Sequence, residues 1–278
     1  MHQFEMCAQM CYDEKNSDHT SGPVERRLSM DGHFIDPTPE TLADEHLCCI
    51  IRSKKPHPGA EAKRRWLADR LQEGHVFRKL QAKATVFIEY APLETAWVPI
   101  EGDNYLYLYC LWVDSAHKGQ GYGRALMEHC LADARARSRS GACMLGAEKQ
   151  KSWSSDQSFA GRYGFRAVDA TPQGYRLLAH AFDGTVPRFA ESAKRGTIEE
   201  ERLTIYYDAQ CPYVWQSLQT VRKYCEAQGV PFVLIEVDTL DEAKALPCVF
   251  NDYAVFYHGR FETVNLLDTA YLKRILKK

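Results

Sequence analysis

Three glycines follow an apolar run at a spacing that suits the binding of phosphate. Residues 105–113 are almost entirely aromatic or aliphatic, as in a buried strand, and Gly119, Gly121 and Gly123 come shortly after them. Because glycine has no Cβ atom, the backbone N–H groups of such a loop can approach phosphate oxygens closely, and the positive end of a following helix adds to the attraction. The segment therefore predicts a pyrophosphate-binding site.

Residues on both sides of these glycines complete the predicted site. Lys118 and Arg124 would bring positive charges to the phosphate groups, and residues 124–137 carry apolar positions at helical spacing. The predicted donor-binding residues are Leu111, Trp112, Val113, His117, Lys118, Gly119, Gln120, Gly121, Tyr122, Gly123 and Arg124.

The spacing separates three classes of phosphate-binding loop. A Walker loop would need Gly-Lys followed by Ser or Thr, which this segment lacks. A dinucleotide-binding G-x-G-x-x-G loop would need glycine at Arg124 and an acidic residue about 20 positions further on. The remaining pattern, from Lys118 to Gly123 after a strand that ends at Val113, resembles the acyl-CoA-binding motif of the GNAT superfamily. The alternative is a glycine-rich connector that binds no ligand.

The composition is typical of a soluble enzyme with about two domains, at 278 residues and 45% hydrophobic content. A net charge of −2 with scattered Lys and Arg residues argues against nucleic acid as a partner. No apolar stretch approaches the roughly 20 residues of a membrane helix, and the first residues lack the features of a signal peptide. We therefore expect a cytoplasmic protein with no membrane partner. Its ten cysteines contain no C-x-x-C pair, so we expect reduced thiols and no metal site.

Periodicity and turn residues predict alternating helices and strands. Helices are expected over 42–49, 60–72, 124–137, 155–162, from the loop at 208–215 to 228, and over 269–277. Strands are expected over 34–35, 76–80, 84–98, 105–113, 142–146, 165–168, 175–182, 203–207 and 231–237, with a hairpin within 254–263. This order predicts an α/β (α+β) fold with a polar extension (1–30), an acyl-CoA-binding domain with a mixed central sheet (31–190), a linker (191–201) and a small thioredoxin-like α/β domain (202–278).

From about residue 33 the chain resembles one branch of the GNAT superfamily, the N-acetyltransferases with a C-terminal YoaP-like domain. The segments that carry the resemblance are 45–49, 87–97, 110–113 with the glycine loop, 159–165 and 256–261. The resemblance implies the GNAT fold, acetyl-CoA as the acyl donor, and transfer of the acetyl group to an amine of a small molecule or a peptide. It implies no particular acceptor.

The resemblance also implies where the chemistry would take place. A backbone N–H within 111–113 would polarise the thioester carbonyl. The superfamily's usual acid for the thiolate is a tyrosine, but the matching position holds Ala160, so Tyr163 either takes this role or packs in the core. Glu89 and Glu94 lie in a predicted apolar strand, where burial would raise the pKa of a carboxylate and suit it to take a proton from an amine. Alternatively, both face solvent.

Cys211 suggests a second class of function. It begins a Cys-Pro-Tyr-Val segment that resembles the Cys-Pro-Tyr-Cys of glutaredoxins with Val214 in place of the second cysteine. A thiol at the start of a helix is acidified by the helix dipole, so a monothiol redox or binding protein with ancillary CoA binding is the alternative hypothesis. In that fold Pro247 would be the cis-proline. Otherwise Cys211 is inert, and its domain shapes the acceptor site or a homodimer contact.

Overall fold

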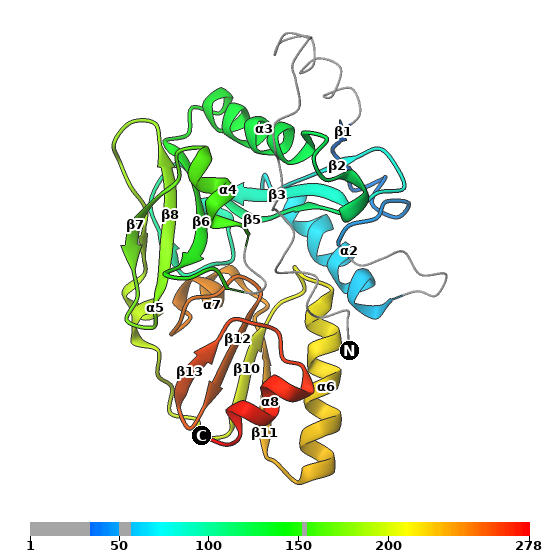
Figure 1. Ribbon diagram of the computed structural model, residues 1–278. Coiled ribbons are helices and arrows are strands. Elements are labelled where there is room, and N and C mark those ends of the chain that lie inside the picture. Colours follow the sequence, from blue (N-terminus) through cyan, green and yellow to red (C-terminus); the bar gives the residue numbers. More distant parts are fainter. Residues whose placement is uncertain (1–33, 50–56, 152–154) are drawn as a thin grey trace.

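The structure is a computed structural model that describes residues 34–49, 57–151 and 155–278. It contains a seven-stranded mixed sheet followed by a smaller four-stranded sheet (Figure 1). The elements are β1 (Phe34–Ile35), α2 (Pro58–Leu71), β2 (Val76–Leu80), β3 (Val86–Pro92), the short 3-10 helix η2 (Leu93–Thr95), β4 (Ile100–Glu101), β5 (Tyr105–Val113), the 3-10 helix η3 (Ser115–His117), α3 (Tyr122–Ala136), β6 (Gly141–Ala147), α4 (Gln157–Arg162), β7 (Arg166–Ala170), β8 (Tyr175–Ala181), β9 (Arg188–Phe189), α5 (Glu191–Arg195), β10 (Leu203–Tyr207), α6 (Tyr213–Gln228), β11 (Phe232–Glu236), α7 (Leu240–Ala245), β12 (Tyr253–Tyr257), β13 (Arg260–Thr263) and α8 (Thr269–Ile275).

The large sheet has the strand order β1-β2-β3-β5-β6-β8-β7. Its strands alternate between two faces, and the face that carries Ile88 and Leu108 packs against the apolar side of α3. The opposite face carries Phe87 and packs against Trp66 and Leu67 of α2. Strand β5 lies near the middle of this sheet and contributes side chains to the cores on both faces.

Strands β5 and β6 separate part of the way along their length. They are parallel and pair only from Tyr105 with Gly141 to Tyr107 with Cys143. Strand β5 continues to Val113 and stays paired with β3 to its end, whereas β6 stays paired with β8. The later part of β5 therefore presents an open backbone edge toward β6. A register shift at Glu89 and Tyr90 marks a bulge in the β3–β5 ladder just after this point.

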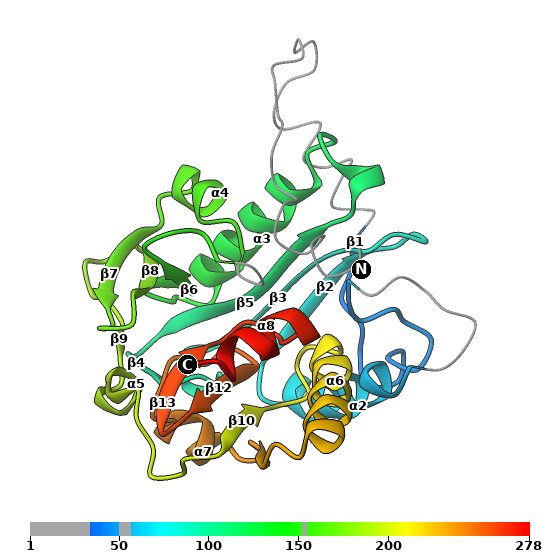
Figure 2. The same cartoon turned by 60° about the horizontal axis from the view of Figure 1, so that its bottom comes forward.

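The small sheet has the order β11-β10-β12-β13, with β10 and β11 parallel and the other neighbours antiparallel. One of its faces packs against α6 and α8 through residues such as Leu218 and Leu272. Its other face packs against the large sheet, where Phe250 and Phe256 share one core with Phe87 and Trp66. Figure 2 shows the small sheet and its helices lying against the large sheet. The two units thus share a hydrophobic core.

Several expectations about the elements are wrong. Residues 42–49 form turns and bends instead of a helix, because the bonds that follow Leu42, from Asp44 to Thr41 and from Glu45 to Leu42, span only three residues. The expected strand over 84–98 ends at Pro92, whose ring removes a ladder donor. The expected linker contains α5, with Ala193 fully buried, and α7 was not expected at all.

The peptide bonds of the described ranges, that of Pro247 included, are all trans, so the expected cis-proline is not there. Among the helices of these ranges, none has the length and hydropathy that crossing a bilayer requires.

Candidate functional site

The glycine loop begins with a capped turn and ends at the start of α3. Asp114 accepts hydrogen bonds from the backbone N–H groups of Ala116 and His117, at 3.1 and 3.2 Å, and from Nδ1 of His117 at 2.7 Å. Gly119 and Gly121 then adopt left-handed conformations with φ of 70° and 84°. Residues with side chains rarely adopt such angles, so these two glycines allow the chain to turn directly into the helix.

The start of α3 directs backbone N–H groups toward the glycine loop, where an anion could bind. The N–H of Ala125 makes the first helical bond, to the carbonyl of Gly121 at 3.0 Å. By helix geometry, the N–H groups before it point out of the helix end, where the positive end of the helix dipole also lies. A Cβ atom on Gly123 would lie 3.5 Å from Phe159 and 3.6 Å from Val113, so the helix start lies close to the end of β5. These features can bind a pyrophosphate next to the open edge of β5.

The structure brings the predicted loop residues together, but not all of them point their side chains toward an anion. Gln120 Nε2 donates to the carbonyl of Ala116 at 2.9 Å, and the guanidinium of Arg124 pairs with Glu128 one turn along α3, at 3.1 Å. Tyr122 packs edge-on against Phe34. Leu111 and Val113 are buried in the core between the large sheet and α3, whereas Trp112 lies on the opposite face of the sheet. Lys118 lies within the loop. The backbone, rather than these side chains, supplies most of the predicted contacts.

Glu89 lies at the centre of a buried polar cluster between the two units. Its side chain is 2% exposed and forms a salt bridge with the ammonium of Lys63 in α2. His75 Nε2 donates to the same carboxylate oxygen at 2.9 Å, and Gln210 Nε2 of the C-terminal unit donates to the other at 2.8 Å. Both oxygens of Glu89 are therefore occupied by groups that come from three other segments of the chain.

These contacts reverse the pKa expected for Glu89. Burial raises the pKa of this carboxyl, but the positive charge of Lys63 and the hydrogen bond from His75 outweigh burial, so the net shift is downward. Burial also lowers the pKa of His75, which leaves its imidazole neutral at pH 7. The expectation of a raised pKa at Glu89 is thus wrong. The sequence could not reveal this, because Lys63, His75 and Gln210 are distant in the chain.

Glu94 lies neither in a strand nor near the glycine loop. It belongs to η2, its side chain is 42% exposed, and it pairs with Arg139 beyond the end of α3 at 2.9 Å. It also accepts a hydrogen bond from the backbone N–H of Asn104 at 2.8 Å. Asn104 directly precedes β5, whereas the glycine loop follows the other end of that strand. The placement of Glu94 in a buried strand was therefore wrong.

Tyr163 and Ala160 are both part of the packing around α4. Ala160 is 1% exposed within the α3 core and offers no acidic group. The ring of Tyr163 packs against that of Phe159, with 5.0 Å between centroids, and its carbonyl accepts a hydrogen bond from His180 Nδ1. The contact with Phe159 accounts for the packing of the ring, and the role of Tyr163 as the acid for the thiolate stays a prediction.

Cys211 lies where the C-terminal unit meets α2. Its carbonyl accepts from the N–H of Val214 at 3.0 Å, and it lies just before Pro212, the N-cap residue of α6. A Cβ on Gly59 of α2 would clash with the carbonyl oxygen of Pro212, so the two backbones are in close contact. The thiol of Cys211 is hydrogen-bonded to the carboxyl of Asp252.

Asp208 and Asp252 are site residues that the sequence did not single out. The backbone N–H of Asp208 donates to the carbonyl of Asp252 at 3.1 Å, and the two flank the paired residues Tyr207 and Tyr253. Burial raises the pKa of both, that of Asp252 to about 7. Their positions just outside two predicted strands were visible, but the pairing of those strands was not. Within the described ranges, no three His, Cys, Asp or Glu side chains are arranged to hold a metal ion.

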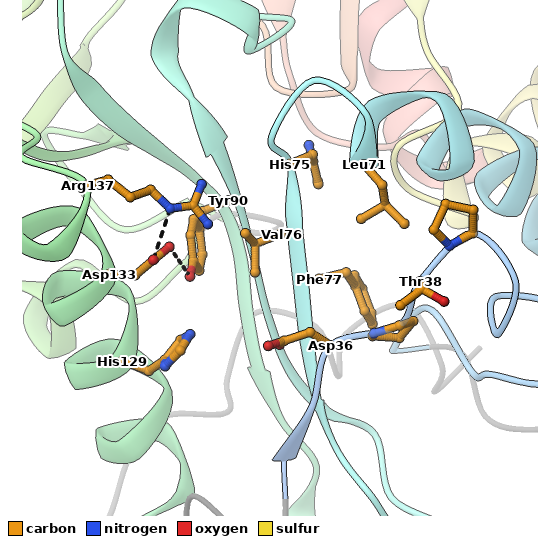
Figure 3. A pocket seen from close by; sticks show the side chains of 12 residues that line it. Asp36, Thr38, Leu71, His75, Val76, Phe77, Tyr90, His129, Asp133 and Arg137 are labelled. Atoms are coloured by element: carbon orange, nitrogen blue, oxygen red, sulfur yellow. Dashed lines mark hydrogen bonds and ion pairs between the residues drawn. The ribbon is translucent and has the colours of Figure 1, made fainter.

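A separate cavity of about 370 Å³ opens at the β1–β2 edge of the large sheet (Figure 3). Its polar wall is already paired, because Asp133 accepts from the hydroxyl of Tyr90 at 2.8 Å and from Nε of Arg137 at 2.9 Å. Strand β3 separates this edge from β5. We therefore do not assign this cavity to the chemistry of the glycine loop.

Two solved acetyltransferases align with a little more than half of the chain. One is a GNAT family acetyltransferase from Brucella melitensis in complex with acetyl-CoA, with 19% identity, a TM-score of 0.38, and coverage of 56% of this chain and 92% of that chain. The other is the PaiA N-acetyltransferase from Thermoplasma acidophilum in complex with coenzyme A, with 14% identity, a TM-score of 0.37, and coverage of 54% and 98%.

Sequence comparison assigns both units of the chain. The model of the acetyltransferase (GNAT) family matches residues 41–165, and the YoaP-like model matches residues 231–274. An uncharacterized N-acetyltransferase YoaP from Bacillus subtilis (strain 168) is 34% identical over 245 residues, which cover 87% of this chain and 98% of the relative. The glycine loop, the separated strands and the YoaP-like unit occur together in one chain, and that chain belongs to the GNAT acetyltransferase family, in the branch that carries a YoaP-like domain.

Proposed function

We propose that this acetyltransferase binds acetyl-CoA with its pyrophosphate at the start of α3 and its pantetheine arm along the open edge of β5. The observation that carries the proposal is the pair of left-handed glycines, Gly119 and Gly121, which lead directly into a helix start beside that edge. Oriented N–H groups and the helix dipole favour an anion there. Beyond Tyr107, where the pairing of β5 with β6 ends, the backbone of β5 supplies hydrogen-bonding groups for the amide-rich arm.

In the proposed reaction, an amine of the acceptor attacks the acetyl carbon of the thioester. The carbon–nitrogen bond forms, the carbon–sulfur bond breaks with its electron pair on sulfur, the nitrogen loses one proton, and the thiolate gains one. A backbone N–H within 111–113 would stabilise the negative charge on the carbonyl oxygen. We assign neither Glu89 nor Glu94 to proton transfer, because the first is fully paired in the interior and the second lies at the far end of β5.

The position of the C-terminal unit supports a role for it in binding the acceptor. It covers the face of the large sheet opposite α3, where Tyr107 and Tyr109 of β5 are buried. Its strand order, with β10 and β11 parallel and α6 between them, supports our description of it as thioredoxin-like. We therefore propose that it shapes the acceptor site for a small-molecule amine.

The test compares two glycine variants of the full chain. Gly121→Glu places a side chain and a negative charge where the phosphates would bind, at a position with φ of 84°. Gly184→Glu is the matched control, because Gly184 has the same φ of 84° and lies in an exposed loop with no atoms within 4 Å of an added Cβ. Calorimetry should show CoA affinity reduced by at least about tenfold, or about 1.4 kcal/mol, in the first variant only. Equal affinity in both variants would contradict the proposal.

A further inference from the structure

Asp208 and Asp252 form a carboxylate pair that faces the large sheet. The pairs Tyr206–Ala254 and Tyr207–Tyr253 belong to one antiparallel ladder, and the two aspartates occupy the next position along it. Directly opposite residues in such a ladder share a face of the sheet. Tyr206 and Ala254 contribute to the core shared with the large sheet, so alternation places both aspartates on that same side, two residues further on.

The pair lacks a positive partner within the described ranges. Asp208 is 1% exposed, and its Oδ2 has no hydrogen-bond partner there, while its Oδ1 accepts from the backbone N–H of Gln210 at 2.8 Å. The nearby cation is Lys63, which makes its salt bridge with Glu89. Its charge opposes the effect of burial on the pKa of both aspartates, but burial is the larger effect and the pKa of each is raised. One lysine thus faces three carboxylates, and a buried unpaired carboxylate oxygen is costly unless a ligand satisfies it.

The aspartate pair lies beside β5, the strand along which we propose that acetyl-CoA binds. The hydroxyl of Tyr107 in β5 donates to Oδ1 of Asn251, the neighbour of Asp252, at 2.7 Å. Asp208 also acts electrostatically on the hydroxyl of Tyr109 in the bulge of β5. Asp252 and its hydrogen-bonded neighbour Cys211 are partly exposed, whereas Asp208 is buried.

We propose that Asp208 and Asp252 bind an ammonium group of the acceptor, which makes the acceptor a cationic amine. The inference rests on the proposed function, since it names the substrate class for the same active site. An ammonium offers three N–H donors to the two carboxyl groups, one of which has an unpartnered oxygen. Its positive charge would oppose the effect of burial, which raises the pKa of both aspartates, and so favour their ionised forms. An acceptor with a carboxylate beside its amine would be repelled from this site.

The first experiment measures binding to the full chain in the presence of CoA, by ligand-observed NMR titration. The probes are n-butylamine and n-butanol, which have the same carbon chain and differ in the ammonium group. We expect the amine to bind and the alcohol not to bind. Asp208→Asn and Asp252→Asn should each weaken amine binding by about tenfold or more, because each removes a charge-assisted hydrogen bond.

Asp238→Asn is the matched control, because Asp238 is an exposed aspartate of the same unit. It should leave amine binding unchanged. In Asp208→Asn, the amide oxygen of the new side chain can still accept from the N–H of Gln210, so this variant should unfold no earlier than wild type. Equal amine binding in wild type and in the Asp208→Asn/Asp252→Asn double variant, or binding of butanol as tight as that of butylamine, would overturn the proposal.

Turnover separates this inference from the proposed function. With an alkylamine acceptor that is turned over, the aspartate variants should raise the KM for the amine and leave the KM for acetyl-CoA unchanged. A chain that binds the amine but transfers acetyl from acetyl-CoA to none of a panel of amines would contradict the proposed function and leave the carboxylate pair as an amine site. Turnover with an unchanged KM for the amine in both variants would contradict the assignment of Asp208 and Asp252 as the ammonium site and leave the proposed function standing.

Discussion

Glu89→Gln distinguishes a structural carboxylate from a catalytic one. The substitution keeps the size of the side chain but removes the charge that pairs with Lys63, whose own side chain is 1% exposed. The Lys63 ammonium would then remain in the interior without its salt-bridge partner, next to the rings of Trp66 and Phe77 at 5.0 and 5.6 Å and near the carboxyl groups of Asp208 and Asp252. The hydrogen bond from Gln210 can persist, because a glutamine oxygen still accepts it.

The expected cost follows from this geometry. Removing one partner of a buried ion pair typically costs about 3–5 kcal/mol, because the other charge is left uncompensated. At about 2–4 °C per kcal/mol, the midpoint of thermal unfolding should fall by roughly 6–20 °C. A general base in a folded active site would behave differently, with turnover reduced by about 10²–10⁴-fold and stability little changed.

Thermal unfolding and acetyl-CoA turnover are measured on the same preparations. Glu94→Gln is the control, because it removes an exposed pair with Arg139 and should cost no more than about 1 kcal/mol. The double variant Lys63→Met/Glu89→Gln removes both buried charges and should be more stable than Glu89→Gln alone. A Glu89→Gln protein with wild-type stability and strongly reduced turnover would refute this reasoning and restore Glu89 as the base.

Two further predictions concern the C-terminal unit. Burial lowers the pKa of Lys244 to about 8, and its ammonium donates to the carbonyls of Leu93 and Ile100 at 2.7 and 3.3 Å. Between about pH 8 and 10 the unfolded chain therefore binds more protons than the folded chain, so the stability of wild type relative to Lys244→Met should increase as the pH rises. Urea unfolding at several pH values in this range measures the difference. A difference that does not change with pH would contradict the lowered pKa. Cys211→Ser keeps a donor for Asp252, so acetyl transfer should stay within about threefold of wild type, and loss of transfer in a folded, CoA-binding variant would favour a thiol function.

The donor loop could be predicted from the sequence because its requirements are local. Gly119 and Gly121 must adopt positive φ, which few other residues do, and Gly123 allows the helix start to approach Val113. Residues 105–113 were also recognisable as a strand, because a buried strand is a continuous apolar run. Nearest neighbours in the chain carry all of this information.

The environments of the acidic residues Glu89, Asp208 and Asp252 could not be predicted in the same way. The direction in which the pKa of Glu89 shifts depends on Lys63 and His75, which lie 26 and 14 positions away in the sequence. The adjacency of Asp208 and Asp252 depends on the pairing of β10 with β12, and single-strand patterns do not specify a partner.

Strand β5 explains why the two halves of the proposed site come from different units. Its edge beyond Tyr107 is open toward β6, on the side where the start of α3 would hold the phosphates. Its face opposite α3 carries Tyr107 and Tyr109, which the C-terminal unit covers with Asn251 and the aspartate pair. A donor held along the edge and an acceptor held against this face would meet at the bulge of β5. The first unit alone would expose that face and would lack both aspartates, so our proposal requires the C-terminal unit for acceptor binding as well as for the shared core.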